Sequence, residues 1–211
     1  MKAHRSTGLY RILESAAIYD RFQRLLGGHR ARARFVEEMI RPVAGMRILD
    51  IGCGPGTILD YLPTEIEYVG YDLNPQYIAA AEKKYGTRGQ FLCARVSSAP
   101  AFSSEHGFDI VLAKSTLHHL DDEEARGVMS SAYAHLAPTG ALVTIDPVYH
   151  RGQAFLSRLI ISLDRGRQVR TPEQYTALAT TYFPGVEGQV VTDMLPIPYS
   201  HFLMRARKTG S

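Results

Sequence analysis

The chain has 211 residues, of which 45% are hydrophobic and 21% are charged, so it is long and apolar enough for one globular domain with a sizeable core. Its formal net charge of +3 is too small to indicate by itself a nucleic-acid-binding protein. The pattern predicts a cytoplasmic protein with two free thiols and no membrane span, because no apolar leader follows Met1 and the most apolar segment, 155–163, is short and contains Arg158.

The N-terminal part of the chain is predicted to be mostly helical. Apolar residues recur at helical spacing over 9–27, where two glycines end the pattern. A second amphipathic segment, about 31–40, ends before Pro42. Both segments precede the first predicted strand, so we expect residues 1–42 to form a helical cover outside the main sheet.

A strand predicted over 46–51 runs into a glycine-rich turn. Its apolar residues suit a buried parallel strand, and the glycines at 52, 54 and 56 lack the Cβ atoms that would block a tight turn or a close ligand. The next strand, 67–72, ends at Asp72. Ligands of open α/β sheets bind outside the carboxyl ends of the strands, where a carboxylate can bind both hydroxyls of a ribose. These two strands therefore predict a nucleoside site.

The rest of the chain alternates strands with helices, which predicts a parallel sheet covered by helices on both faces. One helix begins at the N-cap Asn74 and ends at Gly86. Asp121 and Glu124 match a capping box for a second helix that runs to Leu136. The other predicted elements are, in chain order, strands over 91–93, 109–114 and 141–146, helices over 151–164 and from Pro172, and strands over 188–194 and 201–206.

The glycine-rich turn carries a resemblance to a known family. Its glycines are spaced G-x-G-x-G, with Thr57 where the G-x-G-x-x-G dinucleotide fingerprint has its third glycine. Residues 48–56 closely resemble the first motif of class I S-adenosylmethionine-dependent methyltransferases, and the resemblance runs in order over about 47–147. Three later features that fit the same family are Asp72, Phe108-Asp109-Ile110-Val111 and 136–142.

The resemblance implies a fold and a division of the chain. The fold is a doubly wound α/β sheet of seven strands, mostly parallel with an antiparallel last strand and with helices on both faces. One domain, 1–211, would contain a cofactor-binding core over 43–147 and a C-terminal helix and strand hairpin over 172–211. An insertion after the fifth strand, 148–171, would form a lid, because an element at the carboxyl end of a central strand is well placed to close over a site.

The resemblance also implies S-adenosylmethionine as the cofactor. The backbone of the glycine-rich turn would face its methionine part, at the positive end of the following helix. Asp50 would orient this turn and reach the amino group of the cofactor, with a purely structural role as the alternative. Asp72 would bind the ribose, and Leu73 would pack on the adenine. The turn residues concerned are Gly52, Cys53, Gly54 and Gly56.

Two basic residues, Arg95 and Lys114, stand at positions of the expected cofactor site where a positive charge is unexpected. The third strand of the family usually ends in an acid that accepts a hydrogen bond from the adenine, but Arg95 stands there and cannot accept one. Adenine recognition would then use backbone groups around Arg95 and Val96, the side chain of Ser97, or stacking by the guanidinium. Lys114, at the end of the fourth strand, would repel the sulfonium, so we expect its amine to point to solvent or to the methionine carboxylate.

His118 is the candidate general base. A hydroxyl acceptor must lose its proton, and histidine is the usual base near neutral pH. His118 and His119 follow the fourth strand, and neighbouring residues of a helical turn point about 100° apart, so at most one should face the substrate. The alternative is that both only close the core or face water. Tyr149 and His150 are rival bases after the fifth strand.

The predicted lid gives the clue to the substrate. Arg165, Arg167 and Arg170 lie in it, and arginine suits carboxylates and phosphates, so the acceptor is anionic if they contact it; a solvated charge run is the alternative. Enzymes of this fold that methylate amino groups of DNA and RNA share an Asn/Asp-Pro-Pro-Tyr motif, where Lys114-Ser115-Thr116 stands here. Asp146 is the only acid near the end of the fifth strand, so no metal site is expected.

The leading hypothesis is S-adenosylmethionine-dependent O-methylation of a small polar or anionic metabolite, with no DNA partner. One alternative is an RNA or protein methyltransferase that uses a separate recognition partner, which the basic lid permits. The other is a non-catalytic module that binds S-adenosylmethionine.

Overall fold

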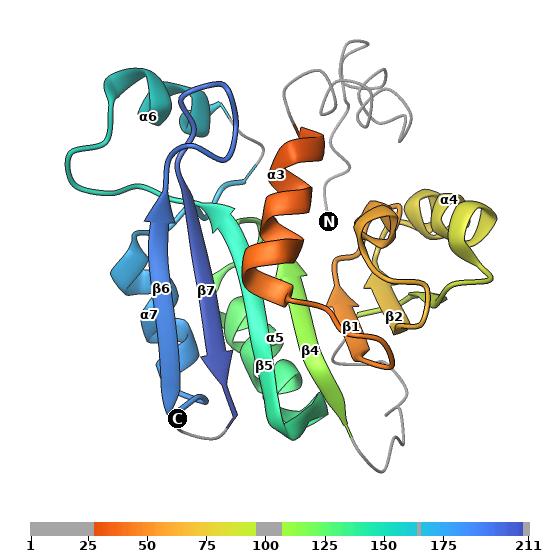
Figure 1. The fold of residues 1–211 in the computed structure, drawn as a ribbon. Coiled ribbons are helices and arrows are strands. Elements are labelled where there is room, and N and C mark those ends of the chain that lie inside the picture. Colours follow the sequence, from red (N-terminus) through yellow and green to blue (C-terminus); the bar gives the residue numbers. More distant parts are fainter. Residues whose placement is uncertain (1–27, 96–106, 164–165, 209–211) are drawn as a thin grey trace, which may run out of the picture.

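The computed structural model describes residues 28–95, 107–163 and 166–208, and its centre is a single sheet (Figure 1). The strands are β1 (Arg47–Ile51), β2 (Glu67–Asp72), β3 (Gln90–Cys93), β4 (Phe108–Lys114), β5 (Leu136–Pro147), β6 (Gly185–Val191) and β7 (His201–Arg207). They form a seven-stranded sheet in the order β3-β2-β1-β4-β5-β7-β6. Neighbours are parallel from β3 to β5, and β7 is antiparallel to both β5 and β6. The fold predicted from the sequence is confirmed.

Helices cover both faces of this sheet. They are α3 (Gly28–Phe35), the π-helical turn η1 (Val36–Ile40), the 3-10 turns η2 (Thr57–Tyr61) and η4 (Leu117–His119), α4 (Pro75–Tyr85), α5 (Asp122–His135), α6 (Phe155–Ser162) and α7 (Pro172–Thr180). Residues of α3, η1, η2 and α4 pack in one apolar cluster with Ile48 and Leu112. Residues of α5 and α7 pack in a second cluster with Leu49 and Val111. Because successive strand residues point to opposite faces, β1 and β4 supply both clusters.

The predicted helix caps are present. Asn74 accepts a backbone N–H of the first turn of α4 at 2.9 Å. Asp121 and Glu124 form the reciprocal capping box at the start of α5. Thr171 and Gln174 form another box in front of α7, which the sequence analysis did not identify. These side chains satisfy N–H groups that have no partner within the helix, and they fix where each helix begins.

Two strands differ from the prediction by three or more residues at an end. β5 begins at Leu136 rather than at 141, because Leu136 already pairs with Phe108 ahead of a register shift in the ladder. β6 covers Gly185–Val191 rather than 188–194. A short apolar and glycine-containing run does not fix its own ends, since strand ends are set by pairing with the neighbouring strand.

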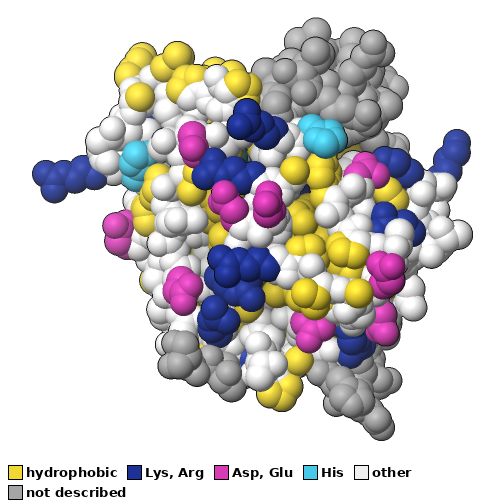
Figure 2. Space-filling model, in the orientation of Figure 1, with side chains coloured by type: hydrophobic (Ala, Val, Ile, Leu, Met, Phe, Trp, Pro, Cys, Tyr) yellow, Lys and Arg dark blue, Asp and Glu magenta, His cyan; other side chains and the backbone are white. Residues whose placement is uncertain are grey.

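One side of α6 is apolar and exposed. Phe155 is 80% exposed and Leu163, directly after the helix, is 77% exposed. Figure 2 shows hydrophobic side chains gathered over α6 at the top of the molecule. Across the described residues, no helix is long and apolar enough to cross a membrane. The amphipathic helix predicted over 9–27 lies outside the described residues.

Candidate active site

A cavity of about 1070 Å³ opens at the carboxyl ends of the central strands. The chain passes from β1 to β2 on one side, whereas β4 lies on the other side of β1, so the strand order reverses at this point. Open α/β sheets bind their ligands at such a switch point. The predicted site residues that line the cavity are Gly52, Cys53, Gly54, Asp72, Leu73, Arg95, Lys114 and His118.

Two glycines of the turn after β1 are needed for different reasons. Gly52 has a φ of 77°, and a Cβ there would lie 2.5 Å from Oγ1 of Thr116. That hydroxyl donates a hydrogen bond to the carbonyl of Ile51 at 3.1 Å, so it is not free to move away. Gly54 has a φ of 56°, and apart from Gly54 and its two chain neighbours no atom of the described residues lies within 4 Å of the place of its Cβ. Because Gly54 lines the cavity, this open space is available to a ligand.

Asp72 joins the turns that follow β1 and β2. Its Oδ2 accepts the N–H of Gly54 at 2.9 Å, and its Oδ1 accepts the N–H of Asn74 at 2.8 Å. An ionised carboxylate has about four acceptor positions, so each oxygen keeps one for a ligand hydroxyl. Asp72 therefore holds the floor of the cavity together and can still bind a ribose.

Two predicted cofactor residues do not line the cavity. Asp50 is fully buried, and its Oδ2 accepts the hydroxyl of Tyr68 at 2.7 Å. Burial raises the pKa of Asp50 to about 6, against the opposing charge of Lys114. Gly56 has a φ of 70° and lies against two aromatic rings of the core. A direct contact of Asp50 or Gly56 with a cofactor stays a prediction.

The expected adenine end of the cavity carries an apolar side chain and an ion pair. Leu73 is 58% exposed at the cavity wall. Nη1 of Arg95 lies 3.4 Å from Oε1 of Glu124 on α5, and both residues line the cavity. Val96 lies outside the described residues. Arg95 occupies the position at which the family usually has an acid, and the carboxylate of Glu124 lies beside its guanidinium.

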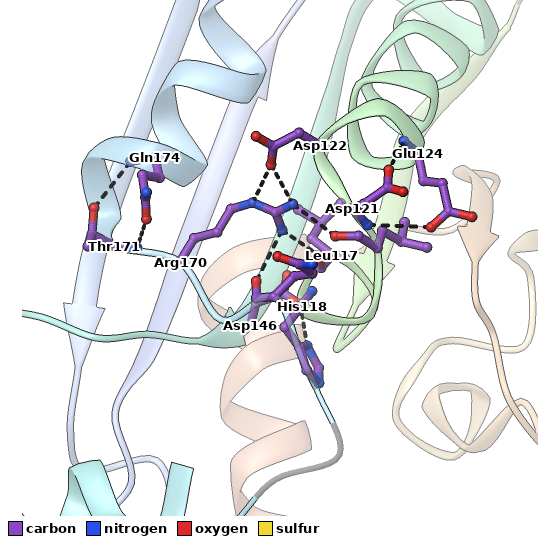
Figure 3. Close-up of polar contacts among 11 residues, drawn as sticks. Leu117, His118, Asp121, Asp122, Glu124, Asp146, Arg170, Thr171 and Gln174 are labelled. Atoms are coloured by element: carbon purple, nitrogen blue, oxygen red, sulfur yellow. Dashed lines mark hydrogen bonds and ion pairs between the residues drawn. The ribbon is translucent and has the colours of Figure 1, made fainter. Parts of the chain in front are cut away.

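His118 pairs with a carboxylate that the sequence analysis did not assign to it. His118 is 3% exposed, and its Nδ1 lies 2.8 Å from Oδ1 of Asp146, near the end of β5 (Figure 3). The same oxygen accepts the backbone N–H of His118 at 3.2 Å. Burial raises the pKa of Asp146, and the hydrogen bonds from His118 oppose that rise. A carboxylate at Nδ1 holds the proton there, so Nε2 is left as the acceptor.

Both histidines of η4 line the cavity, and that at most one of them faces the substrate stays a prediction. The ring centroids of His118 and His119 lie 4.0 Å apart, with His118 buried and His119 exposed. Gly166, in the segment after α6, packs directly against the imidazole of His118, so a Cβ at this position would collide with the ring. The N–H of Gln168 donates to the carbonyl of His118 at 3.0 Å. The segment before α7 therefore covers the buried histidine.

Arg170 fixes the loop that carries the histidines. It is 6% exposed, and its Nη1 donates to the carbonyl of Leu117 at 2.8 Å. Its Nη2 donates to the carbonyl of Leu120 at 2.8 Å and to a carboxylate at the start of α5 at 2.8 Å (Figure 3). Arg170 therefore fits neither alternative given for the cluster, because it is buried rather than solvated and its donors bind groups of the protein. Of the other two arginines in that predicted cluster, Arg167 is exposed and Arg165 lies outside the described residues.

The rival bases lie away from the cavity. Nε2 of His150 is 3.1 Å from the hydroxyl oxygen of Ser200, and the ring of Tyr149 lies under the guanidinium of Arg158. Neither Tyr149 nor His150 lines the cavity. In the sequence, Asp146 is noticeable only as a potential metal ligand. One signal could have indicated its pairing with His118. Asp146 lies near the end of β5, and His118 follows β4, which is the neighbouring strand.

Segments beyond the cofactor-binding core complete the cavity. Ile160 and Leu163 line it from the side of α6, and Tyr199 and His201 line it near the start of β7. No motif marked these residues, because apolar and aromatic side chains are common in any core. Ser115, which also lines the cavity, has a φ of 52°, an uncommon backbone conformation that is frequent at binding sites.

Comparison with known proteins gives a family for the central part of the chain. A family described as a methyltransferase domain matches residues 49–142. A ubiquinone biosynthesis O-methyltransferase from Rhodopseudomonas palustris is 30% identical over 105 residues, which cover 49% of this chain and 41% of that protein. The alignment thus spans less than half the length of this curated relative.

Two solved structures share the fold over nearly the whole chain. The pyocyanin biosynthetic protein PhzM superposes with a TM-score of 0.71 at 15% identity, over 96% of this chain and 62% of that one. The N-methyltransferase NodS from Bradyrhizobium japonicum, in complex with S-adenosyl-l-homocysteine, superposes with a TM-score of 0.65 at 19% identity, over 96% and 97% of the two chains. At these identities the likeness establishes the fold alone.

Proposed function

Because the chain belongs to the class I S-adenosylmethionine-dependent methyltransferase family, whose cofactor is S-adenosylmethionine, we propose that it transfers a methyl group to a hydroxyl of a small-molecule acceptor. The observation that carries the proposal is the buried pair of His118 and Asp146, with Nδ1 and Oδ1 2.8 Å apart at the wall of the cavity. The proposal has two parts, a cofactor held at the switch point and an acceptor hydroxyl that loses its proton to the histidine.

The described residues fit the cofactor. Gly54 leaves open space at the cavity floor, and Asp72 keeps an acceptor position on each oxygen for a ribose hydroxyl. Leu73 offers an apolar surface to the adenine. When bound, S-adenosylmethionine supplies a methyl group on a sulfonium, which is already an activated leaving group.

His118 would take the proton of the acceptor hydroxyl. Asp146 accepts the Nδ1 proton of the ring, so Nε2 is the basic nitrogen. The carboxylate also stabilises the imidazolium that forms, as in other carboxylate–histidine pairs that act as bases. Gly166 and the segment before α7 cover the ring and restrict water there, which strengthens the interaction between the two charges.

The cavity supports a small acceptor. Its volume of about 1070 Å³ is at the upper end of the range of small-molecule pockets, and it has to hold both the cofactor and the acceptor. Ile160, Leu163 and Tyr199 on the outer wall suit an acceptor with an aromatic or apolar body. The name of the relative from Rhodopseudomonas palustris, an O-methyltransferase, supports an oxygen acceptor.

Conversion of S-adenosylmethionine to S-adenosylhomocysteine tests the proposal. The purified chain is incubated with a panel of phenols, hydroxy acids and matched amines, and both S-adenosylhomocysteine and the methylated product are measured by mass spectrometry. We expect turnover that depends on a hydroxylated acceptor and yields a methyl ether. The matched control is the His118→Ala variant, which should bind S-adenosylhomocysteine and turn over about 10²–10⁴-fold more slowly.

Two outcomes would contradict this proposal. Methylation of the amines in preference to the hydroxyl compounds would replace the oxygen acceptor and make His118 unnecessary as a base. Tight binding of S-adenosylhomocysteine without turnover of any small acceptor would favour a non-catalytic module or a macromolecular substrate.

A further inference from the structure

The outward side of α6 is apolar, which reverses the usual arrangement of a surface helix. Ser157 and Ile161 are buried against the body of the protein. The exposed side chains are large and apolar, namely Phe155, Leu156, Leu159 and Leu163. A surface helix normally buries its apolar side and exposes polar residues. Of the seven large hydrophobic side chains that are exposed in the described parts of the chain, four belong to this one segment, and such a gathering marks a binding surface.

Three of these side chains form a stripe that leads to the cavity. Phe155, Leu159 and Leu163 follow one another at intervals of four residues, so they lie on one side of the helix. At a rise of about 1.5 Å per residue the stripe is about 12 Å long. Leu163 is exposed to solvent and also lines the cavity. The stripe therefore continues the cavity wall onto the surface of the protein.

The loop between β6 and β7 lies beside α6 at the mouth of the cavity (Figure 1). Leu195, Ile197 and Tyr199 line the cavity from this loop. The hydroxyl oxygens of Ser157 on α6 and of Ser200 at the end of the loop lie 3.1 Å apart, and both serines are buried. This contact fixes α6 against the loop, so apolar side chains stand on both sides of the mouth.

The size and the charge of this surface favour a single hydrocarbon chain as its ligand. Four side chains on and directly after an eight-residue helix are far fewer than the roughly 20–30 residues that each partner of a stable protein interface contributes. Within α6 the charged residue is Arg158, and its guanidinium lies over the ring of Tyr149, 4.9 Å from the ring centroid. A chain of methylene groups needs no charged partner and matches a narrow apolar stripe.

We propose that α6 binds the apolar chain of an amphiphilic acceptor. The hydroxylated head of the acceptor lies in the cavity beside His118, and its chain leaves through the mouth and lies along Leu163, Leu159 and Phe155. The inference rests on the proposed function, because methyl transfer to the head places the chain at this wall. The segment after β5 then selects the acceptor by its chain, and the exposed apolar surface of α6 is buried when the acceptor is bound.

A series of 4-alkylphenols tests the proposal, because these compounds share one hydroxylated head and differ only in the length of the chain. The ethyl, butyl, octyl and dodecyl compounds are bound to the full chain in the presence of S-adenosylhomocysteine, and their affinities are measured by equilibrium dialysis with mass spectrometry. Each added methylene group should tighten binding about two- to fourfold until the chain outgrows the stripe, since the hydrocarbon leaves water for an apolar surface.

Serine substitutions along α6 measure where the chain lies. Leu159→Ser should weaken binding of the octyl and dodecyl compounds about 10-fold and leave the ethyl compound unchanged. Phe155→Ser, at the far end of the stripe, should weaken only the dodecyl compound. Both positions are exposed, so the variants should fold. Val43→Ser is the matched control, because Val43 is an exposed apolar residue outside α6, and it should change none of the affinities.

An affinity that does not depend on chain length in the wild type overturns the subsite. A length dependence that Leu159→Ser and Phe155→Ser leave intact also overturns it, because the chain then lies elsewhere. If Leu159→Ser has no effect on the phenols but dissociates a dimer in analytical ultracentrifugation, or abolishes cosedimentation with phosphatidylcholine vesicles, α6 binds a second copy or a bilayer instead.

Failure of the proposed function gives a different result. A chain-length dependence that the two variants remove, without methyl transfer to any of the phenols, would keep the apolar subsite and contradict the methyl transfer. Turnover of 4-ethylphenol without any chain-length dependence would contradict the subsite alone.

Discussion

Each oxygen of Asp72 holds one backbone N–H, from the turn after β1 and from the turn after β2. The remaining acceptor positions are those that we assign to a ribose. We expect Asp72→Ala to weaken S-adenosylhomocysteine binding by about 1–3 kcal/mol, because charge-assisted hydrogen bonds are lost. Asp72→Asn keeps the size and one acceptor oxygen and should lose less. Calorimetric affinities that are equal in the wild type and Asp72→Ala would contradict the assignment.

Asp50 predicts a pH dependence of stability. Burial raises its pKa to about 6 in the folded chain from an ordinary value of 3.8, so the folded state favours the protonated carboxyl. The free energy of unfolding should fall as pH rises from about 4 to about 6, by up to about 3 kcal/mol from this group, and not change further above that range. Urea unfolding at the two ends of the range measures this contribution.

The matched variant for that measurement is Asp50→Asn. It does not titrate, and its carbonyl oxygen can still accept the hydrogen bond of Tyr68. The difference in unfolding free energy between wild type and variant removes the contributions of other carboxyl groups. A difference that is the same at about pH 4 and about pH 7 would show that Asp50 has an ordinary pKa in the folded chain.

His118 and Asp146 should act as a unit in turnover. His118→Ala should lower the rate by about 10²–10⁴-fold and leave the affinity for S-adenosylhomocysteine nearly constant. His119→Ala should do far less, because His119 is exposed, whereas His118 is buried and held by Asp146. The wild-type rate should fall at low pH, since a protonated imidazole cannot take the proton of the acceptor. Rates that are equal in wild type and His118→Ala over the whole pH range would exclude His118 as the base.

At the scale of elements, the loop between β4 and α5 depends on one arginine. Arg170 donates to the carbonyls of Leu117 and Leu120 and to Asp122, the first residue of α5. Arg170→Met should lose these bonds, leave the Leu117 carbonyl without its partner, and destabilise the fold by about 1–3 kcal/mol. Hydrogen exchange should rise at residues 117–120, and Arg167→Met, at an exposed position, is the control. Unchanged exchange in that loop would contradict the clamp.

The elements that the sequence predicted well carry local signals. The capping box of Asp121 and Glu124 and the N-cap Asn74 are made by residues that are close in sequence, so they can be identified without the fold. The early start of β5 at Leu136 depends on pairing with Phe108, which is distant in sequence. Such boundaries follow from the neighbouring strand and not from the segment itself.

The same distinction between local signals and long-range contacts explains which parts of the candidate site could be predicted from the sequence. Asp72 lies at a strand end next to a glycine-rich turn, and this arrangement is visible in the sequence. Asp146 meets His118 across 28 positions, and Arg170 meets Leu117 across 53 positions, so neither contact has a local signal. Their close spacing in the sequence makes Arg165, Arg167 and Arg170 look like one cluster. In the fold, Arg170 is buried and Arg167 is exposed.

At the scale of the whole molecule, the site joins parts of the chain that are otherwise connected only through the sheet. Its walls come from the turns after β1 and β2, from the segment after β4, from α6 and from the start of β7. A ligand bound there contacts segments from across the sheet and has no comparable site in the unfolded chain. Binding should therefore oppose global unfolding and not only order a loop.

We accordingly expect S-adenosylhomocysteine to raise the temperature of unfolding of the whole chain. A free concentration about 100 times its Kd stabilises the folded state by about 2.7 kcal/mol, which corresponds to about 5–10 °C for a chain of this size. NAD at the same concentration should give no shift, because Thr57 replaces the third glycine of the dinucleotide fingerprint. Asp72→Ala is the internal control and should show a smaller shift with S-adenosylhomocysteine. Scanning calorimetry measures both shifts. A shift with NAD and none with S-adenosylhomocysteine would contradict the prediction that the glycine-rich turn binds S-adenosylmethionine.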